Sequence, residues 1–270
     1  MKSILIHLTD GNGMTPAVTA GLTLAARFDS KILGLYTIPS LATSFWGSET
    51  AEFLPTLENQ LKKTAQTALA RFQEMTANTA LSVTSKCVDN AYLSTISEAS
   101  FGHDLLVTTQ LKSSPQTMVE MEFQAPDIIV GVSCPTLVVP QSFHADTIGE
   151  HILIAWNNSR EASRAVRDAL PLLLKAKFVV VLHVTPAHSD PVGTETIVEF
   201  LNNHGIPHIL VSRLAPSASV TKSIQDAVAE YNADLLVMGA WGHSRLRELV
   251  LGGVTREILA QMTIPVLMSH

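Results

Sequence analysis

The chain has 270 residues, which at roughly 150 residues per domain predicts about two domains. Hydrophobic residues make up 46% of it and charged residues only 16%, so an intrinsically disordered chain is excluded. Its 24 acidic and 18 basic residues give a net charge of −6. Because such a field does not attract polyanions, we expect no nucleic-acid partner.

Apolar runs in this sequence have the length of strands and do not approach the roughly 18 residues of a membrane helix, so no membrane partner is expected. The run after Met1 is interrupted by Asp10 and is too short for a signal peptide, which predicts a cytoplasmic protein. Cys87 and Cys134 form no C-x-x-C pair, and we expect both to be buried thiols rather than a disulfide or a metal site.

The two halves of the chain repeat each other. Three strand-like segments recur in the same order: Ser3–Ile6 as His151–Ile154, Asp104–Val107 as Asp234–Val237, and Cys134–Leu137 as Ile264–Leu267. The offset between the copies falls from 148 to 130 positions, so the first half carries 18 extra residues, which we place within 41–78. A polar stretch at 140–150 separates the copies and predicts domains at 1–147 and 148–270.

In the first half, a strand over 3–6 precedes a helix that Thr15 is expected to cap, with Pro16 at the first position, where its missing N–H costs no bond. Within the extra residues a long helix is indicated by apolar residues at helical spacing, namely Leu54, Leu57, Leu61, Ala65, Ala68, Leu69 and Phe72. Strands are expected again at 104–107 and from residue 136 onward.

In the second half, a strand over 152–156 precedes Asn158 and Glu161, a capping pattern that opens a helix with an apolar face from Ala162 to Leu173. Strands are then expected at 178–184, 208–213, 234–239 and 265–269, and helices at 197–203, 220–231 and 254–262. Strands and helices that alternate in this way require right-handed crossovers and a parallel sheet with helices on both faces.

Ligands of such sheets bind outside the carboxyl ends of the strands, so the loops after the first and fourth strands matter most. The second half has Gly239 and Gly242, then nine residues, then Gly252. Gly252 and Gly253 would present free N–H groups at the start of a helix, where an anion such as phosphate is favoured, and Thr255 adds a hydroxyl. Alternatively, each glycine simply permits a tight turn.

This spacing resembles the universal stress protein family, whose nucleotide-binding motif is G-x2-G-x9-G-(S/T). The resemblance covers the chain as two tandem copies and is more specific in the second. It implies two Rossmann-like domains of the adenine nucleotide alpha hydrolase type, each a five-stranded parallel sheet with helices on both faces. It also implies a stress-response module that binds ATP, with magnesium as its companion ion, through Ala155, Asn157, Val184, Gly239, Gly242, His243, Ser244, Arg245, Gly252, Gly253, Val254 and Thr255.

Two positions of the second half depart from the family pattern. Gly253 stands where the family has Ser or Thr, so a hydroxyl contact to phosphate is lost while the backbone donors remain. Asn157 stands where the family usually has the Asp that meets adenine, although an amide can still bond a base edge. Val184 matches the position whose backbone holds the base. His243, Ser244 and Arg245 could reach phosphates or be merely solvated.

The first half has lost the motif. At the 130-residue offset, the positions of Gly239, Gly242, Gly252 and Thr255 are occupied by Thr109, Lys112, Glu122 and Ala125, and Glu122 would put negative charge where phosphate should lie. This half is therefore expected to be a degenerate domain with a structural or regulatory role. Its one feature that resembles a phosphate-binding loop is a pair of glycines at 11 and 13 after the first strand. This pair is more typical of a simple turn.

Three functions stay open on this sequence: a nucleotide-binding stress module, a stress-response scaffold that binds no nucleotide, and a slow ATPase. No P-loop, Ser-Gly-Gly-x-Asp-Ser loop or G-x-S-x-G motif occurs, so no catalytic residue is assigned. His204 and His208 have metal-like spacing, but Gly205 and Pro207 interrupt the helix that would align them. The family's pairing of last strands would be met within the chain, between 136–140 and 266–270, and a homodimer is optional.

Overall fold

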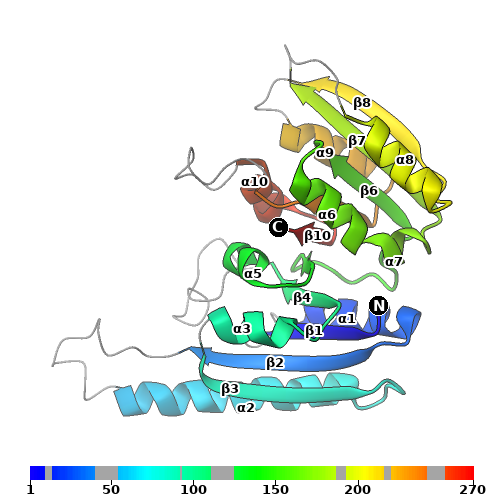
Figure 1. Ribbon diagram of the computed structural model, residues 1–270. Coiled ribbons are helices and arrows are strands. Elements are labelled where there is room, and N and C mark those ends of the chain that lie inside the picture. The colour runs from blue at the N-terminus through cyan, green and yellow to red at the C-terminus, as the bar shows by residue number, and fades with distance from the viewer. Residues whose placement is uncertain are drawn as a thin grey trace. The chain divides into compact units, whose positions relative to one another are not determined.

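The computed structural model describes residues 1–9, 14–39, 54–91, 93–110, 125–186, 193–215, 220–241 and 253–270. The chain folds into two compact units, Met1–Cys134 and Pro135–His270, and Figure 1 labels most of their helices and strands. Each unit contains the predicted α/β architecture, a mostly parallel sheet flanked by helices, so the fold class is confirmed. The five strands expected in each domain are instead divided between the units as four and six described strands. The motif residues Gly242, His243, Ser244, Arg245 and Gly252, and the glycines at 11 and 13, lie outside the described residues.

The first unit has four parallel strands in the order β3-β2-β1-β4. Its elements in chain order are β1 (Ser3–Leu8), α1 (Thr15–Phe28), β2 (Lys31–Pro39), α2 (Leu54–Thr76), β3 (Val83–Ala91), α3 (Leu93–Ser100), β4 (Leu105–Thr109) and α5 (Ala125–Gly131).

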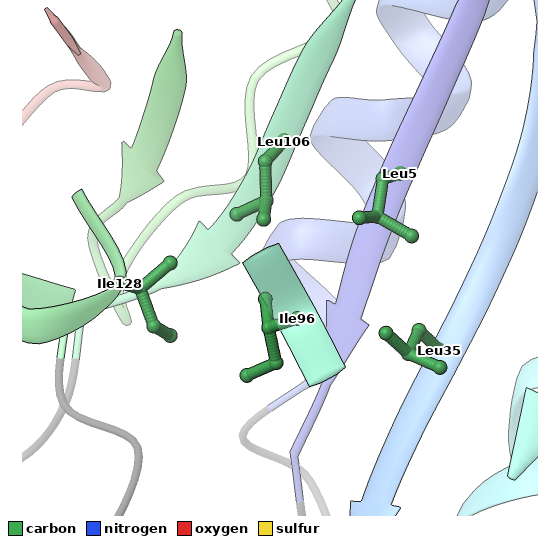
Figure 2. Packing of buried hydrophobic residues seen from close by; sticks show 5 residues of the cluster. All are labelled: Leu5, Leu35, Ile96, Leu106 and Ile128. Atoms are coloured by element: carbon green, nitrogen blue, oxygen red, sulfur yellow. The ribbon is translucent and has the colours of Figure 1, made fainter. Parts of the chain in front are cut away.

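Both faces of the first unit's sheet are covered. Figure 2 shows one of these cores, in which leucines from three neighbouring strands meet Ile96 of α3 and Ile128 of α5. The strand side chains are Leu5, Leu35 and Leu106, which are 0 to 1% exposed. Helices α1 and α2 contact the strands as well. Helix α2 is the long helix with an apolar face that was predicted within the extra residues of the first half.

Strand β5 (Thr136–Val139) opens the second unit, followed by β6 (His151–Trp156), α6 (Arg160–Asp168), α7 (Leu170–Leu173), β7 (Phe178–Pro186), α8 (Glu195–Asn203), β8 (Ile209–Ala215), α9 (Val220–Glu230), β9 (Leu235–Gly239), α10 (Gly253–Gln261) and β10 (Val266–Ser269). The strand order is β5-β10-β9-β6-β7-β8. All pairs in it are parallel except β5 with β10.

The antiparallel pair of β5 and β10 is the predicted pairing of last strands within one chain. Leu137 lies opposite Leu267, and Val138 opposite Val266. Because β5 is bound to β10 in this way, the compact units divide after Cys134, earlier than the polar stretch that suggested a boundary at 147. The last strand of the first sequence repeat thus packs with the second unit.

The sequence repeat has a structural cause at the amino ends of the strands. The carboxylate of Asp104 accepts hydrogen bonds from the backbone N–H groups of Lys2 and Ser3, which start β1. The carboxylate of Asp234 accepts three such bonds, of 2.9 to 3.1 Å, from residues 149–151 at the start of β6. Each unit therefore uses the Asp of the repeated Asp-Leu-Leu-Val segment to hold the neighbouring strand in register.

Helix starts differ from the sequence predictions. Helix α1 already begins at Thr15, and the preceding residue, Met14, makes no side-chain cap, so Thr15 is not the cap. Helix α6 is capped by Ser159, whose Oγ accepts the N–H of Ala162 at 3.1 Å. Asn158 is excluded from that role because its φ of 54° turns the backbone left-handed just before the helix.

The helix predicted from Ala162 to Leu173 is divided at Ala169 into α6 and α7. Pro171 lies in the first turn of α7 and lacks the N–H that would bond the preceding turn, which accounts for the break. Cys87 is exposed and Cys134 is half-buried, so the prediction of two buried thiols was wrong. Among the described residues, every helix is too short or too polar to cross a bilayer.

Candidate functional site

The carboxyl edge of the second unit's sheet is where the strand order reverses. Chain-consecutive strands run outward from β6 through β7 to β8, whereas β9 lies on the other side of β6. Ala155 near the end of β6 is half-buried and lies opposite Met238 of β9 across this switch point. Ligands of doubly wound sheets bind at such an edge, and the described members of the predicted site include Ala155, Asn157, Val184 and Gly239 at this edge.

Asn157 immediately follows β6, and its side chain is exposed. Its Oδ1 accepts the N–H of Ser159 at 3.3 Å, which closes an Asx turn leading into α6. The carbonyl end of the amide is thereby engaged, whereas its NH₂ group can still donate to a ligand.

A tryptophan and a histidine join the ends of β6 and β7. The indole N–H of Trp156, a residue 5% exposed, donates to the carbonyl of Gly193 at 2.8 Å. Nδ1 of the buried His183 lies 3.0 Å from the carbonyl oxygen of Trp156. Next to this pair, Val184 of β7 is half-buried and in register with Arg213 of β8. The edge around Ala155 and Val184 is thus held by two buried aromatic rings.

Gly239 ends β9 directly against the first turn of α6. A Cβ added to it would lie 2.4 Å from the backbone nitrogen of Ala162 and 2.6 Å from the carbonyl carbon of Glu161. Real Cβ atoms do not approach backbone that closely, so glycine is required here by helix packing. The first glycine of the motif therefore has a structural role, whatever binds beside it.

Glu161 was interpreted from the sequence as a capping residue, but its side chain is buried at this edge, with 7% exposure. Its Oε1 lies 3.4 Å from a guanidinium nitrogen of Arg160, whose side chain is exposed. A buried carboxylate within the first turn of α6 places negative charge next to Gly239.

The chain after β9 is tied to β10. The N–H of Ala240 donates to the carbonyl of Ser269 at 2.9 Å, and the carbonyl of Ala240 lies 3.1 Å from Nδ1 of His270. Trp241 follows with a φ of 53°, and its ring meets the His270 ring edge-on at 6.4 Å between centroids. The indole N–H of Trp241 is buried and has no hydrogen-bond partner among the described residues.

Helix α10 begins at Gly253, the position where the family motif has a hydroxyl. Gly253 is exposed, and a Cβ added to it would meet no atom of the described residues within 4 Å. Val254 is half-buried, and Thr255 is 5% exposed. The buried side chain of Thr255 is consequently a poor substitute for the missing hydroxyl, whereas the N–H groups of the first turn, which starts at the exposed Gly253, have no partner within the helix.

Tryptophans 156 and 241, Glu161 and His270 are the residues at this edge that the motif did not indicate. The tryptophans carried one signal in the sequence, since each lies at or just after the carboxyl end of a predicted strand. His270 carried the same signal, because it directly follows the strand expected at 265–269, whereas Glu161 carried none, because only the packing of α6 brings it here.

The corresponding carboxyl edge of the first unit's sheet has different side chains. His7 is aligned with Ala155 by the 148-residue repeat offset, and Thr37 and Thr109 occupy the strand positions of Val184 and Gly239. Nε2 of His7 lies 3.3 Å from Oγ1 of Thr37, and its Nδ1 lies 3.5 Å from Oγ1 of Thr108.

These polar residues continue the strands of the core in Figure 2. Two residues after Leu35, Leu5 and Leu106 come Thr37, His7 and Thr108, so leucines give way to polar side chains on the same face. Burial lowers the pKa of His7 from 6.5 to about 4, and the imidazole is therefore neutral at pH 7. The first unit's edge thus contains a neutral polar row in place of the glycine motif.

The comparisons with known proteins agree with this fold. Residues 215–270 match the family model described as the universal stress protein family. A curated universal stress protein of Synechocystis sp. is 30% identical over 148 residues, which cover 52% of this chain and 48% of that protein. The chain therefore spans about half the length of the curated relative it matches.

Two solved structures share the fold over nearly the whole chain. One is a universal stress protein from Archaeoglobus fulgidus DSM 4304, with a TM-score of 0.75, 14% identity, and coverage of 99% of this chain and 95% of that one. The other is a functionally unknown protein from Pseudomonas aeruginosa PAO1, with a TM-score of 0.61, 18% identity, and coverage of 100% and 92%. Residues 215–270 are thus similar to the universal stress protein family, and the chain shares the fold of these two structures over nearly its whole length.

Proposed function

We propose that the second unit binds an adenine nucleotide, with ATP as the reference ligand, and that the chain acts as a nucleotide-dependent stress-response module. The observation that carries this proposal is the start of α10, where Gly253 is exposed and a Cβ added to it would meet no described atom within 4 Å. It directly follows the glycine-spaced segment at the carboxyl edge of a parallel sheet. Unpaired N–H groups and the helix dipole favour a phosphate there.

The donor set at this edge fits a nucleotide. The NH₂ group of Asn157 is available to a base edge, and the buried indole N–H of Trp241 lacks an acceptor among the described residues. A buried donor without an acceptor is costly, and a bound ligand could supply one. Under this proposal Asn157, Ala155 and Val184 would hold the base and the start of α10 the phosphates, while Gly242, His243, Ser244, Arg245 and Gly252 stay sequence-based assignments.

A scaffold that binds no nucleotide is the second candidate, and specific observations favour it. Gly239 is explained by its contact with Ala162, the Asn157 carbonyl is engaged by Ser159, and the Thr255 side chain is buried. The carboxylate of Glu161 beside Gly239 also opposes an anion, although Arg160 partly offsets its charge. These observations give motif residues roles in packing alone.

Gly253→Ser separates the two candidates, because it restores the family's hydroxyl at a position where an added Cβ meets no described atom within 4 Å. A hydrogen bond to a charged group is worth about 1.5–3 kcal/mol, so we expect ATP affinity to rise about tenfold or more. Isothermal calorimetry with ATP and magnesium measures the affinity. Tryptophan emission provides a second readout, since Trp156 and Trp241 flank the site.

Gly253→Ala is the matched control, because it adds the same Cβ without the hydroxyl and corrects for any change in the stability of α10. We expect its ATP affinity to equal that of the parent chain. If neither the parent nor Gly253→Ser binds millimolar ATP while both melt normally, the nucleotide proposal is wrong and the scaffold function is favoured.

A further inference from the structure

Strand β8 is the outer strand of the second unit and has an apolar character that is unusual for an edge. It pairs with β7 on one side, and no other described strand pairs with it. Ile209 is 39% exposed, Leu210 is 42% exposed and Leu214 is 80% exposed. An exposed apolar edge strand is a template for pairing with another chain.

The first unit's edge strand, β3, occupies the corresponding place and lacks this character. Its exposed residues include Thr84, Lys86 and Asp89, and Asp89 forms an ion pair with Lys62 at 3.4 Å. Charges of this kind are the usual protection of an edge against association. The two units thus have the same topology at this place, but only β3 is protected.

The charge on β8 does not oppose pairing. Its one ionisable residue, Arg213, forms an ion pair with Glu230 and donates to the carbonyl of Ser223, both on α9. Side chains alternate along a strand, so Leu210, Ser212 and Leu214 share the opposite face from Arg213. The exposed leucines therefore lie on the face without charge.

We propose that β8 pairs antiparallel with β8 of a second copy of this chain, about a two-fold axis at Ser212. This register places Leu210 of each copy opposite Leu214 of the other, so the exposed leucines cover each other. Arg213 then lies opposite Val211 instead of the second Arg213, which avoids contact between like charges. A shift by one pair of residues would lose the leucine pairing and, in one direction, place the two arginines together.

The expected dimer is weak. Stable protein interfaces bury about 1,200–2,000 Å² in total, and one pair of seven-residue strands provides less than that. We therefore expect a concentration-dependent dimer at micromolar to millimolar protein. This pairing is independent of nucleotide binding, because β8 does not contain any residue assigned to that site.

A disulfide trap tests the register in the full chain. In a background with Cys87→Ser and Cys134→Ser, Ser212→Cys places two thiols opposite each other with Cα atoms about 4.5–5.5 Å apart, within disulfide range. Leu210→Cys is the matched control on the same strand and face, because its two copies would lie about 13 Å apart. We expect mild oxidation to cross-link most of the first variant and little of the second.

Sedimentation velocity over a range of concentrations tests the association itself. Leu214→Lys places a charge on the edge and is expected to weaken the dimer at least about tenfold. Phe101→Lys, which alters a side chain 70% exposed in the first unit, is expected to leave association unchanged. Equal cross-linking of both cysteine variants, or a parent chain that stays monomeric at all concentrations, would overturn the proposal.

Discussion

The buried histidine of the first unit links folding to pH at the scale of a single residue. His7 is 4% exposed, and burial lowers its pKa from 6.5 to about 4. Between these two values the unfolded chain binds a proton that the folded chain does not. The free energy of unfolding should therefore fall by about 1.4 kcal/mol per pH unit below pH 6.5, to a total of about 3 kcal/mol.

His7→Gln removes this titration while it keeps a polar side chain beside Thr37 and Thr108. We expect urea unfolding of the first unit to depend less steeply on pH in the variant than in the parent between pH 4.5 and 6.5. All other titrating groups are common to both chains, so the difference isolates His7. Identical pH dependences would show that His7 is protonated in the folded chain as readily as in the unfolded one.

Gly239 illustrates a motif residue whose first requirement is packing. Gly239→Ala would place a Cβ 2.4 Å from the backbone nitrogen of Ala162, so α6 or β9 must shift. We expect the free energy of unfolding of the second unit to fall by about 1–3 kcal/mol. Gly253→Ala adds the same group in open space and should change it little. Denaturant titration of both variants makes the comparison, and equal stabilities would contradict the packing explanation.

At the scale of the element, the start of α6 shows how backbone conformation selects a cap. Ser159 has an extended backbone, with φ −94° and ψ 164°, and its hydroxyl accepts an N–H of the first turn. Asn158, one residue earlier, has a left-handed backbone conformation, which turns the chain just before the helix. The sequence pattern predicted Asn158 as the cap, whereas the observed dihedral angles assign that role to Ser159.

Separate substitutions of Ser159 and Asn158 distinguish their roles. Ser159→Ala should lower the free energy of unfolding by about 1 kcal/mol, because the N–H of Ala162 loses its acceptor. Asn158→Gly should be nearly neutral, since glycine adopts a left-handed conformation without a Cβ penalty. Thermal or urea unfolding measures both variants. A larger loss for Asn158→Gly would mean that Asn158, not Ser159, stabilises the helix start.

At the scale of the whole molecule, β5 decides where the chain can be divided. It pairs with β10 over three residue pairs, although it belongs to the first copy of the sequence repeat. A fragment of residues 135–270 keeps this pair, whereas a fragment of residues 148–270 leaves β10 with an unpaired outer side. Unpaired edges of hydrophobic strands promote aggregation.

We therefore expect residues 135–270 to be more stable and more soluble than residues 148–270. Light scattering compares their aggregation, and urea unfolding compares their stability. Both fragments contain the complete glycine motif, so the comparison isolates β5 from the candidate site. If the shorter fragment is equally stable and soluble, β5 contributes nothing to the second unit.

The sequence alone was sufficient for the alternation of strands and helices in the second half, the two-fold repeat, the family resemblance and the edge of the sheet that holds the candidate site. Those features depend on local periodicity and on short repeated segments such as Asp104–Val107 and Asp234–Val237, which are visible without contacts. The sequence also predicted the pairing of β5 with β10, but only through the family resemblance.

Only the tertiary structure shows which residues have structural roles. That Gly239 is required by α6, that Glu161 is buried beside it and that Leu210 and Leu214 are exposed on an edge all depend on contacts between segments far apart in the chain. The helix cap at Ser159 depends on a left-handed turn at Asn158, which local propensity does not specify. Periodicity determines elements, whereas close approach, burial and strand edges arise only when the elements pack.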